Sequence, residues 1–166
     1  SSLGYIHSGM DLFYQSGTVA TISDAQGNFT LENVPPGDGH VRIEAADGKS
    51  TSCIAPVQVP AGGTLQMQLG GTGVSVSGRL VAPQGVEVKS WPDQLYTAQI
   101  HSQWDAYPRP EDLQGEALWR YQMEYAESDA GRARLRGQFV YDFKVQPDGT
   151  FFVPDVLPGR YAVILN

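Results

Sequence analysis

The stretch VQPDGTFFVPDVLPGRYAVIL, residues 145–165, decides the fold because its pattern occurs twice in the chain. The earlier copy is SDAQGNFTLENVPPGDGHVRIEA, residues 23–45. Each copy has a polar turn with a glycine, a phenylalanine, a short apolar run, a Val-x-Pro-Gly corner and an alternating segment. Gly149 lies 122 residues after Gly27, and aligning the two brings both phenylalanines and both corners into register. A repeat of this length predicts a chain built from modules.

Short alternating runs of apolar and polar residues extend outward from both copies, as in HVRIEA (40–45) and VSVSGR (74–79). A period of two is typical of half-buried strands. The chain has 19 glycines and 11 prolines, which separate these runs as turns. We therefore expect a mainly β chain of two modules, residues 1–70 and 71–166, divided at GGTG (70–73). Further strands are expected from Phe29 onward and at residues 57–59, 65–69 and 87–89.

One helix interrupts this pattern. The two copies lie so far apart that the second module must hold an insertion, and PRPEDLQGEALWRYQMEYAES (108–128) supplies it. An apolar stripe at helical spacing runs along this segment through Leu113, Ala117, Leu118, Tyr121 and Tyr125. We expect one helix from about residue 111 to 128, packed against the second module, with Gly131 as its stop. The basic RARLRG segment (132–137) is expected to be a solvated turn.

Composition excludes several functions. The net charge is −7 and the isoelectric point about 4.8, which argues against nucleic-acid binding because phosphates need a basic face. No run approaches the ~20 apolar residues that span a bilayer, so we expect no membrane insertion within this chain. Cys53 is the only cysteine, so it cannot form an intramolecular disulfide, and we expect a buried thiol. His7, His40 and His101 have no metal-ligand spacing. We expect no metal, cofactor or catalytic residue, and no enzyme.

An aromatic cluster is the most suggestive local feature. WPDQLYTAQIHSQWDAYPRP (91–110) contains Trp91, Tyr96, Trp104 and Tyr107 among acids and amides. Aromatic faces beside such groups can stack on a sugar ring or meet a partner protein. The alternative is that the rings pack the inserted helix onto the sheet. Both interpretations stay open at this point.

The two copies resemble a known family. The D-x-x-G-x-F and VPPG pieces between Asp24 and Gly37, and PDGTFFVPDVLPGRY (147–161), resemble carboxypeptidase regulatory-like domains, relatives of the transthyretin-like and Cna B-type sandwiches. The resemblance implies two tandem Greek-key β-sandwich modules, the second with the inserted helix. It also implies an Ig-like fold in a protein that is usually non-catalytic and lies outside the cytoplasm. We expect the first module to be N-terminally truncated, without the family's first strand.

A narrower resemblance concerns residues 125–165. This segment is similar to parts of large bacterial envelope proteins of the planctomycete type, in which such a module precedes a thioredoxin-like redoxin domain. We therefore expect a non-catalytic scaffold or interaction region of a larger protein that is secreted, periplasmic or at the cell surface. Its partner would be a protein or glycan of the cell envelope. One alternative is a carbohydrate-binding module, and a second is the accessory region of such a redoxin protein.

Overall fold

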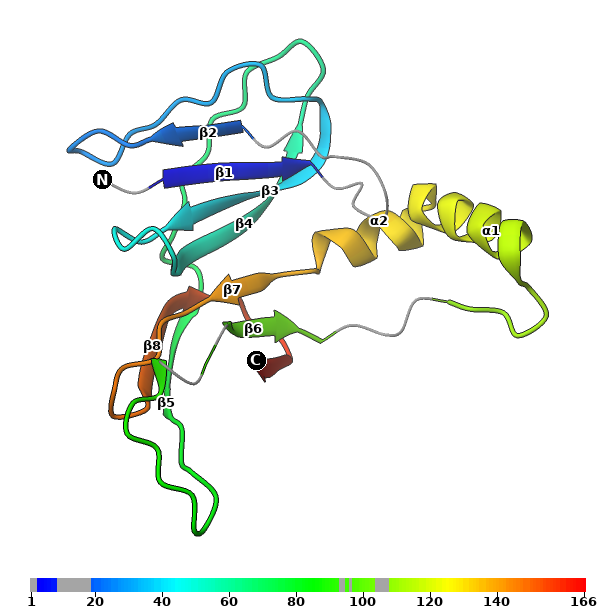
Figure 1. Cartoon of the computed structure of the whole chain (residues 1–166). Coiled ribbons are helices and arrows are strands. Elements are labelled where there is room, and N and C mark those ends of the chain that lie inside the picture. The colour runs from blue at the N-terminus through cyan, green and yellow to red at the C-terminus, as the bar shows by residue number, and fades with distance from the viewer. Residues whose placement is uncertain (1–2, 9–18, 93–94, 96, 104–107) are drawn as a thin grey trace.

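The computed structural model describes residues 3–8, 19–92, 95, 97–103 and 108–166. This part of the chain is mainly β, with antiparallel sheets and two helices (Figure 1), which confirms the predicted class. The strands are β1 (Leu3–Ser8), β2 (Val19–Ile22), β3 (Gly37–Glu44), β4 (Thr51–Val59), β5 (Val74–Arg79), β6 (Ala98–Ser102), β7 (Val140–Asp142), β8 (Thr150–Val156) and β9 (Tyr161–Leu165). The helices are α1 (Gly115–Glu127) and α2 (Asp129–Arg136). Neither helix is long and apolar enough to cross a bilayer.

The strand order repeats between the two parts of the chain. A four-stranded sheet, with the order β2-β1-β3-β4, uses residues up to 59. Later residues form a three-stranded sheet, β7-β6-β9, and a two-stranded sheet, β5-β8. The sequence repeat aligns β3 with β9, so β2-β1-β3 and β7-β6-β9 are the same arrangement. We call the described residues up to 70 the first half and those from 71 the second half.

Two positions of the sequence repeat have the same left-handed backbone conformation in both copies. Gly27 and Gly149 each have φ of +87°. Asn33 and Asp155, six residues further along, have φ of +57° and +51°, a conformation that Asn and Asp tolerate better than other residues with a side chain. In both turns the glycine N–H donates to the carbonyl oxygen three residues earlier, at 3.1 and 2.9 Å. The repeat is therefore a structural unit and not only a sequence pattern.

Two apolar clusters lie on opposite sides of the four-stranded sheet. Val41 and Val57 are buried in the first cluster, where Phe29 packs on them. Ile54 of β4 is buried in the second cluster with Tyr141 and its neighbours from the second half, and Phe151 packs there. Both repeat phenylalanines therefore pack against a core. Because β4 contributes to both clusters, the two halves are packed on each other.

Polar contacts strengthen this junction. The Arg42 guanidinium on β3 lies 2.5 Å from the Asp142 carboxylate on β7. The backbone N–H of Asp142 also donates to Thr51 Oγ1 at 3.1 Å. Arg136 at the end of α2 pairs with Asp38 of β3 at 3.0 Å. No strand runs through residues 70–73, but the division of the chain into modules 1–70 and 71–166 stays a prediction.

The helical region differs from the prediction of one helix over about 111–128. Gly115 begins α1 with φ of +56°, and a turn closed by the Leu113 N–H and the Pro110 carbonyl precedes it. Gly131 lies inside α2, where a Cβ would come within 2.0 Å of the Tyr125 carbonyl oxygen. Glycine is therefore there for close approach, and the expected stop was wrong. The expected turn at 132–137 is the second part of α2.

The expected packing of the helix against the second module was also wrong. Helix α1 has no buried residue and contacts mainly α2. Helix α2 in turn contacts β3 of the first half, and Figure 1 shows both helices to one side of the sheets. The apolar stripe on α1 is therefore only partly covered.

Three predicted strands are not strands in the structure. Residues 29–34, 65–69 and 87–89 are not assigned to any strand of the described chain. By contrast, the run predicted at 57–59 is the end of β4. An alternating pattern predicts an extended backbone, but a strand also needs a neighbour that accepts its hydrogen bonds.

Asp155 fixes the connection between the halves. Its carboxylate accepts hydrogen bonds from the backbone N–H groups of Gly71 at 2.9 Å and Gly73 at 2.5 Å. A Cβ at Gly73 would lie 2.5 Å from the Val156 carbonyl oxygen, so only glycine fits there. One side chain of the second copy thus holds the linker against β8.

We predict that Asp155→Ala lowers the free energy of unfolding by about 2–3 kcal/mol. The variant loses two hydrogen bonds to a charged acceptor and leaves alanine in a left-handed conformation. Asp155→Asn, which retains an acceptor oxygen and tolerates that conformation, should lose about half as much. Urea denaturation measures both values, and equal stability of Asp155→Ala and the parent would show that the carboxylate does not stabilise the linker.

Candidate functional site

An open groove lies against the four-stranded sheet on the side away from the second half. Its volume is about 1350 Å³. One wall is the extended segment Phe29–Val34, the other is the extended segment Leu65–Leu69, and the floor is apolar. The floor residues come from β3 and β4 and are Val41, Ile43, Val57 and Val59. We refer to this feature as the strand groove.

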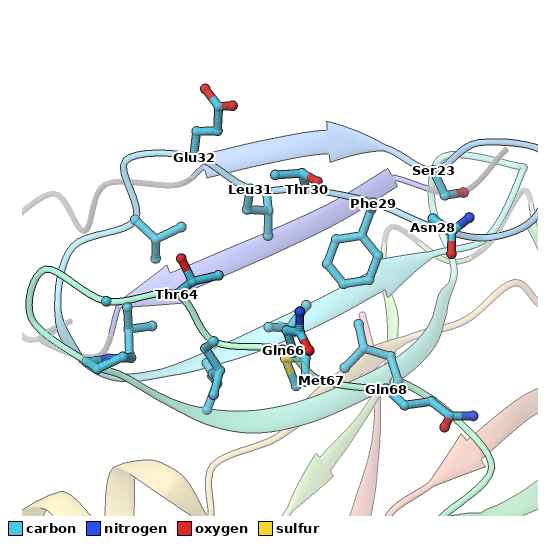
Figure 2. Close-up of a pocket in the computed structure, with 18 of the residues that line it drawn as sticks. Ser23, Asn28, Phe29, Thr30, Leu31, Glu32, Thr64, Gln66, Met67 and Gln68 are labelled. Atoms are coloured by element: carbon cyan, nitrogen blue, oxygen red, sulfur yellow. The ribbon is translucent and has the colours of Figure 1, made fainter.

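The side chains of both walls alternate in burial as those of a strand do, although neither wall is assigned to a strand. Phe29 and Leu31 are half-buried, whereas Thr30 and Glu32 between and beside them are exposed. Figure 2 shows the Phe29 and Leu31 side chains pointing toward the sheet side and Glu32 pointing away. On the facing wall Met67 is half-buried beside the exposed Gln66 and Gln68. Each wall therefore presents an apolar face inward, as a strand of a packed sheet does.

Among the described residues, the backbone of neither wall is paired with another segment. Within the described residues, the backbone N–H and C=O groups of Phe29–Val34 and of Leu65–Leu69 form no hydrogen bonds with one another or with the sheet. Unpaired groups along an extended segment are a template for another strand. The groove thus combines an apolar floor with two hydrogen-bonding edges.

The charge on the lining residues of the groove is weakly negative. Glu32 is the only ionisable residue among those that line it. Asp24 lies in the turn that leads into the first wall, and hydrogen bonds from the Asn28 side chain and backbone hold its pKa below the ordinary value. No Lys, Arg or His is among the lining residues. A ligand with a positive charge at one end would suit this distribution.

A second hollow, of about 860 Å³, has the opposite character. It lies where α2 meets β6 and β9 and is lined by His101, Arg134 and Arg160, with no acid among its lining residues. On the same helix, Arg132 pairs with Asp129 and Arg136 pairs with Asp38. The basic RARLRG segment therefore lies largely in a helix, α2, whose first and last arginines form ion pairs.

Of the four aromatic residues predicted to form a glycan or partner surface, one lies in the described chain. Trp91 is half-buried and packs against the second apolar cluster. A Cβ added at Gly149 would lie 2.7 Å from Trp91 Nε1, so the indole covers the turn of the second copy. Tyr96, Trp104 and Tyr107 lie outside the described residues. The predicted surface at these residues therefore stays a prediction.

Cys53 is buried, as expected. Burial first, and then the neighbouring Asp155 carboxylate, raises the pKa of its thiol to about 11. Burial likewise raises the pKa of the Tyr141 hydroxyl, which accepts a hydrogen bond from the Leu157 N–H at 3.0 Å. Both groups are held neutral and hydrogen-bonded beside the linker. The described residues contain no group of His, Cys, Asp and Glu able to hold a metal ion.

Comparisons with protein-family models, with curated proteins and with solved structures found no match to this chain. The geometry of the described residues therefore carries the functional argument. The groove residues were not predicted as a site, because residues 29–34 and 65–69 have the alternation of ordinary paired strands. Alternation of apolar and polar residues in both segments could have predicted that they line an apolar surface. It could not predict whether they pair with neighbouring strands.

We predict that Trp91→Ala lowers the free energy of unfolding by about 2 kcal/mol. Removing a half-buried indole uncovers the Gly149 turn and leaves a partial cavity in the second cluster. Trp119→Ala is the matched control, because that indole is half exposed on α1 and should change stability by less than about 0.5 kcal/mol. Equal effects of the two substitutions in thermal denaturation would contradict the packing role of Trp91.

We predict that Cys53 makes stability depend on pH in the alkaline range. The folded pKa of about 11 lies above the ordinary value of 9.0, so the folded chain favours the neutral thiol. This contribution is complete below pH 9.0 and is lost as the pH rises through 11. The difference in unfolding free energy between the parent and Cys53→Ala should therefore shrink across that interval. A constant difference would mean that the thiol is not perturbed by folding.

Proposed function

We propose that this chain is a non-catalytic interaction and scaffold region of a larger extracytoplasmic protein, built from two Greek-key sandwich modules of which the first is open. In this proposal the strand groove is the docking site, and its ligand is an extended segment of a partner protein. The single observation that carries the proposal is the pair of unpaired extended walls over an apolar floor.

Strand addition suits this geometry. An extended peptide gains affinity from main-chain hydrogen bonds to an open edge, and specificity from alternate side chains that enter the floor. Here two edges face each other, and the floor residues Val41 and Val57 already form a buried cluster. A flat carbohydrate platform would instead need exposed rings, and Phe29 is half-buried with its ring toward the sheet. The groove therefore favours a protein partner over a glycan.

The second half would act as the rigid support. It packs on the face of the sheet opposite the groove through Ile54 and the Arg42–Asp142 ion pair. A docked segment would thus be held on one side of a sheet whose other side is fixed. This arrangement suits a spacer that orients a partner relative to neighbouring parts of a larger protein. The accessory role beside a redoxin domain is compatible with it and is an alternative form of the same proposal.

A model peptide tests the docking site. We expect a short peptide of alternating threonine and valine, with lysine at each end, to bind the full chain with a dissociation constant of about 100 μM. Leu65→Asp should weaken binding about tenfold, because docking would then desolvate a charge. Isothermal titration calorimetry provides the measurement, with backbone chemical shifts to locate the peptide.

The matched control is Phe152→Asp. Leu65 and Phe152 are both exposed apolar side chains, at 45% and 59%, but only Leu65 lines the groove. Phe152→Asp should leave the affinity unchanged. Equal weakening by both substitutions, or no saturable binding to the parent chain, would contradict the groove as a docking site.

A further inference from the structure

The internal repeat indicates what the strand groove lacks. In the second half, β8 follows the glycine turn and pairs antiparallel with β5. Its counterpart in the first copy, residues 28–34, follows an identical turn with the same positive φ at the glycine. That counterpart has no partner strand among the described residues. The first half thus contains the equivalents of β6, β7, β8 and β9, but the described chain supplies no equivalent of β5.

The pairing of β5 with β8 sets the register that a partner of the first wall would take. Gly78 lies opposite Phe151, and Val76 lies opposite Val153. Moving each β8 residue back by the repeat distance of 122 residues places a glycine opposite Phe29 and a valine opposite Leu31. Because opposite residues of an antiparallel pair share a face, the valine would lie beside Leu31 on the sheet side of the first wall.

The glycine is required by the phenylalanine ring. A Cβ added at Gly78 would lie 2.6 Å from the Phe151 ring, because this ring folds across the neighbouring strand. Phe29 has the same place in the repeat and is half-buried in the groove. A partner strand with a side chain at this position would displace the Phe29 ring from the cluster around Val41.

Charge complementarity indicates the next residue of the partner. In the second half, Arg79 follows Gly78 and its Nε donates to the Asp148 carbonyl oxygen at 3.1 Å. The same position in the first copy is Gln26, in the turn that contains the ionised carboxylate of Asp24. With Glu32 the only ionisable residue lining the groove, an arginine or lysine after the glycine would be the favoured residue.

We propose that the strand groove binds a β5-like strand of a polypeptide outside the described chain, with the pattern Val-x-Gly-Arg or Val-x-Gly-Lys, which pairs antiparallel with residues 28–34. The inference rests on the proposed function and adds the partner's sequence class and register. The glycine accommodates the Phe29 ring, the valine two residues before it lies beside Leu31, and the cation faces the acidic turn. The partner completes the first half in the way that β5 completes the second.

The test uses the chain's own β5 as the probe. A capped peptide of residues 72–81, TGVSVSGRLV, is titrated into the full ¹⁵N-labelled chain. We expect saturable binding, shifts at the amides of residues 28–34, and contacts between the peptide glycine and the Phe29 ring. A peptide with valine in place of Gly78 should bind at least about tenfold more weakly. One with glutamine in place of Arg79 should bind about two- to threefold more weakly, with a difference that vanishes at high salt.

Because the changes are made in the peptide, no outcome depends on a variant chain that fails to fold. Equal binding of the parent and valine peptides at the groove would overturn the proposed register and leave the docking function standing. Shifts confined to residues 150–156 would show exchange with the chain's own β5 and would also overturn the inference. Absence of binding by TGVSVSGRLV, with the alternating threonine–valine peptide still bound, would reject the sequence class alone.

Discussion

The hydrogen-bonding requirement of an extended backbone is the constraint on which this structure depends. A strand has donors and acceptors along both edges, and a sheet is complete only when its inner edges are paired. Beside β8 this requirement is met by β5. Beside residues 28–34, which have the same turn and the same backbone conformation, it is not met within the described chain. The open groove of the first half follows directly from this difference.

The position of the groove follows from the two faces of the four-stranded sheet. Strand β4 sends Ile54 into the cluster of the second half and Val57 into the cluster of the first. The Arg42–Asp142 pair and the Thr51 hydrogen bond occupy the same face as the second half. That face is closed by the chain itself. Within the described residues, the opposite face is covered by the two groove walls, 29–34 and 65–69, so it is the face that we propose for a partner.

The candidate site could be anticipated from the sequence only in part. The alternation at residues 29–34 and 65–69 matches the burial in part, since Phe29, Leu31 and Met67 are half-buried whereas Leu65 is exposed. Whether these segments pair is decided by neighbours distant in sequence, so the pattern could not reveal the groove. The sequence instead predicted a binding surface at the aromatic cluster around Trp91. The one member within the described chain packs over the Gly149 turn, where an indole contributes apolar contact area.

By itself, the sequence determined the β class, the turns and the repeat. Glycine at positions 27 and 149 and Asn or Asp at 33 and 155 fix local backbone angles, and local angles depend on local residues. Only the tertiary structure decided where the helices begin and end, because Gly115 starts α1 in a left-handed conformation and Gly131 allows a close approach inside α2 instead of stopping a helix. It also decided that Asp155 holds the linker and that one wall lacks a strand. Contacts between residues far apart in sequence depend on which surfaces meet, which no single segment encodes.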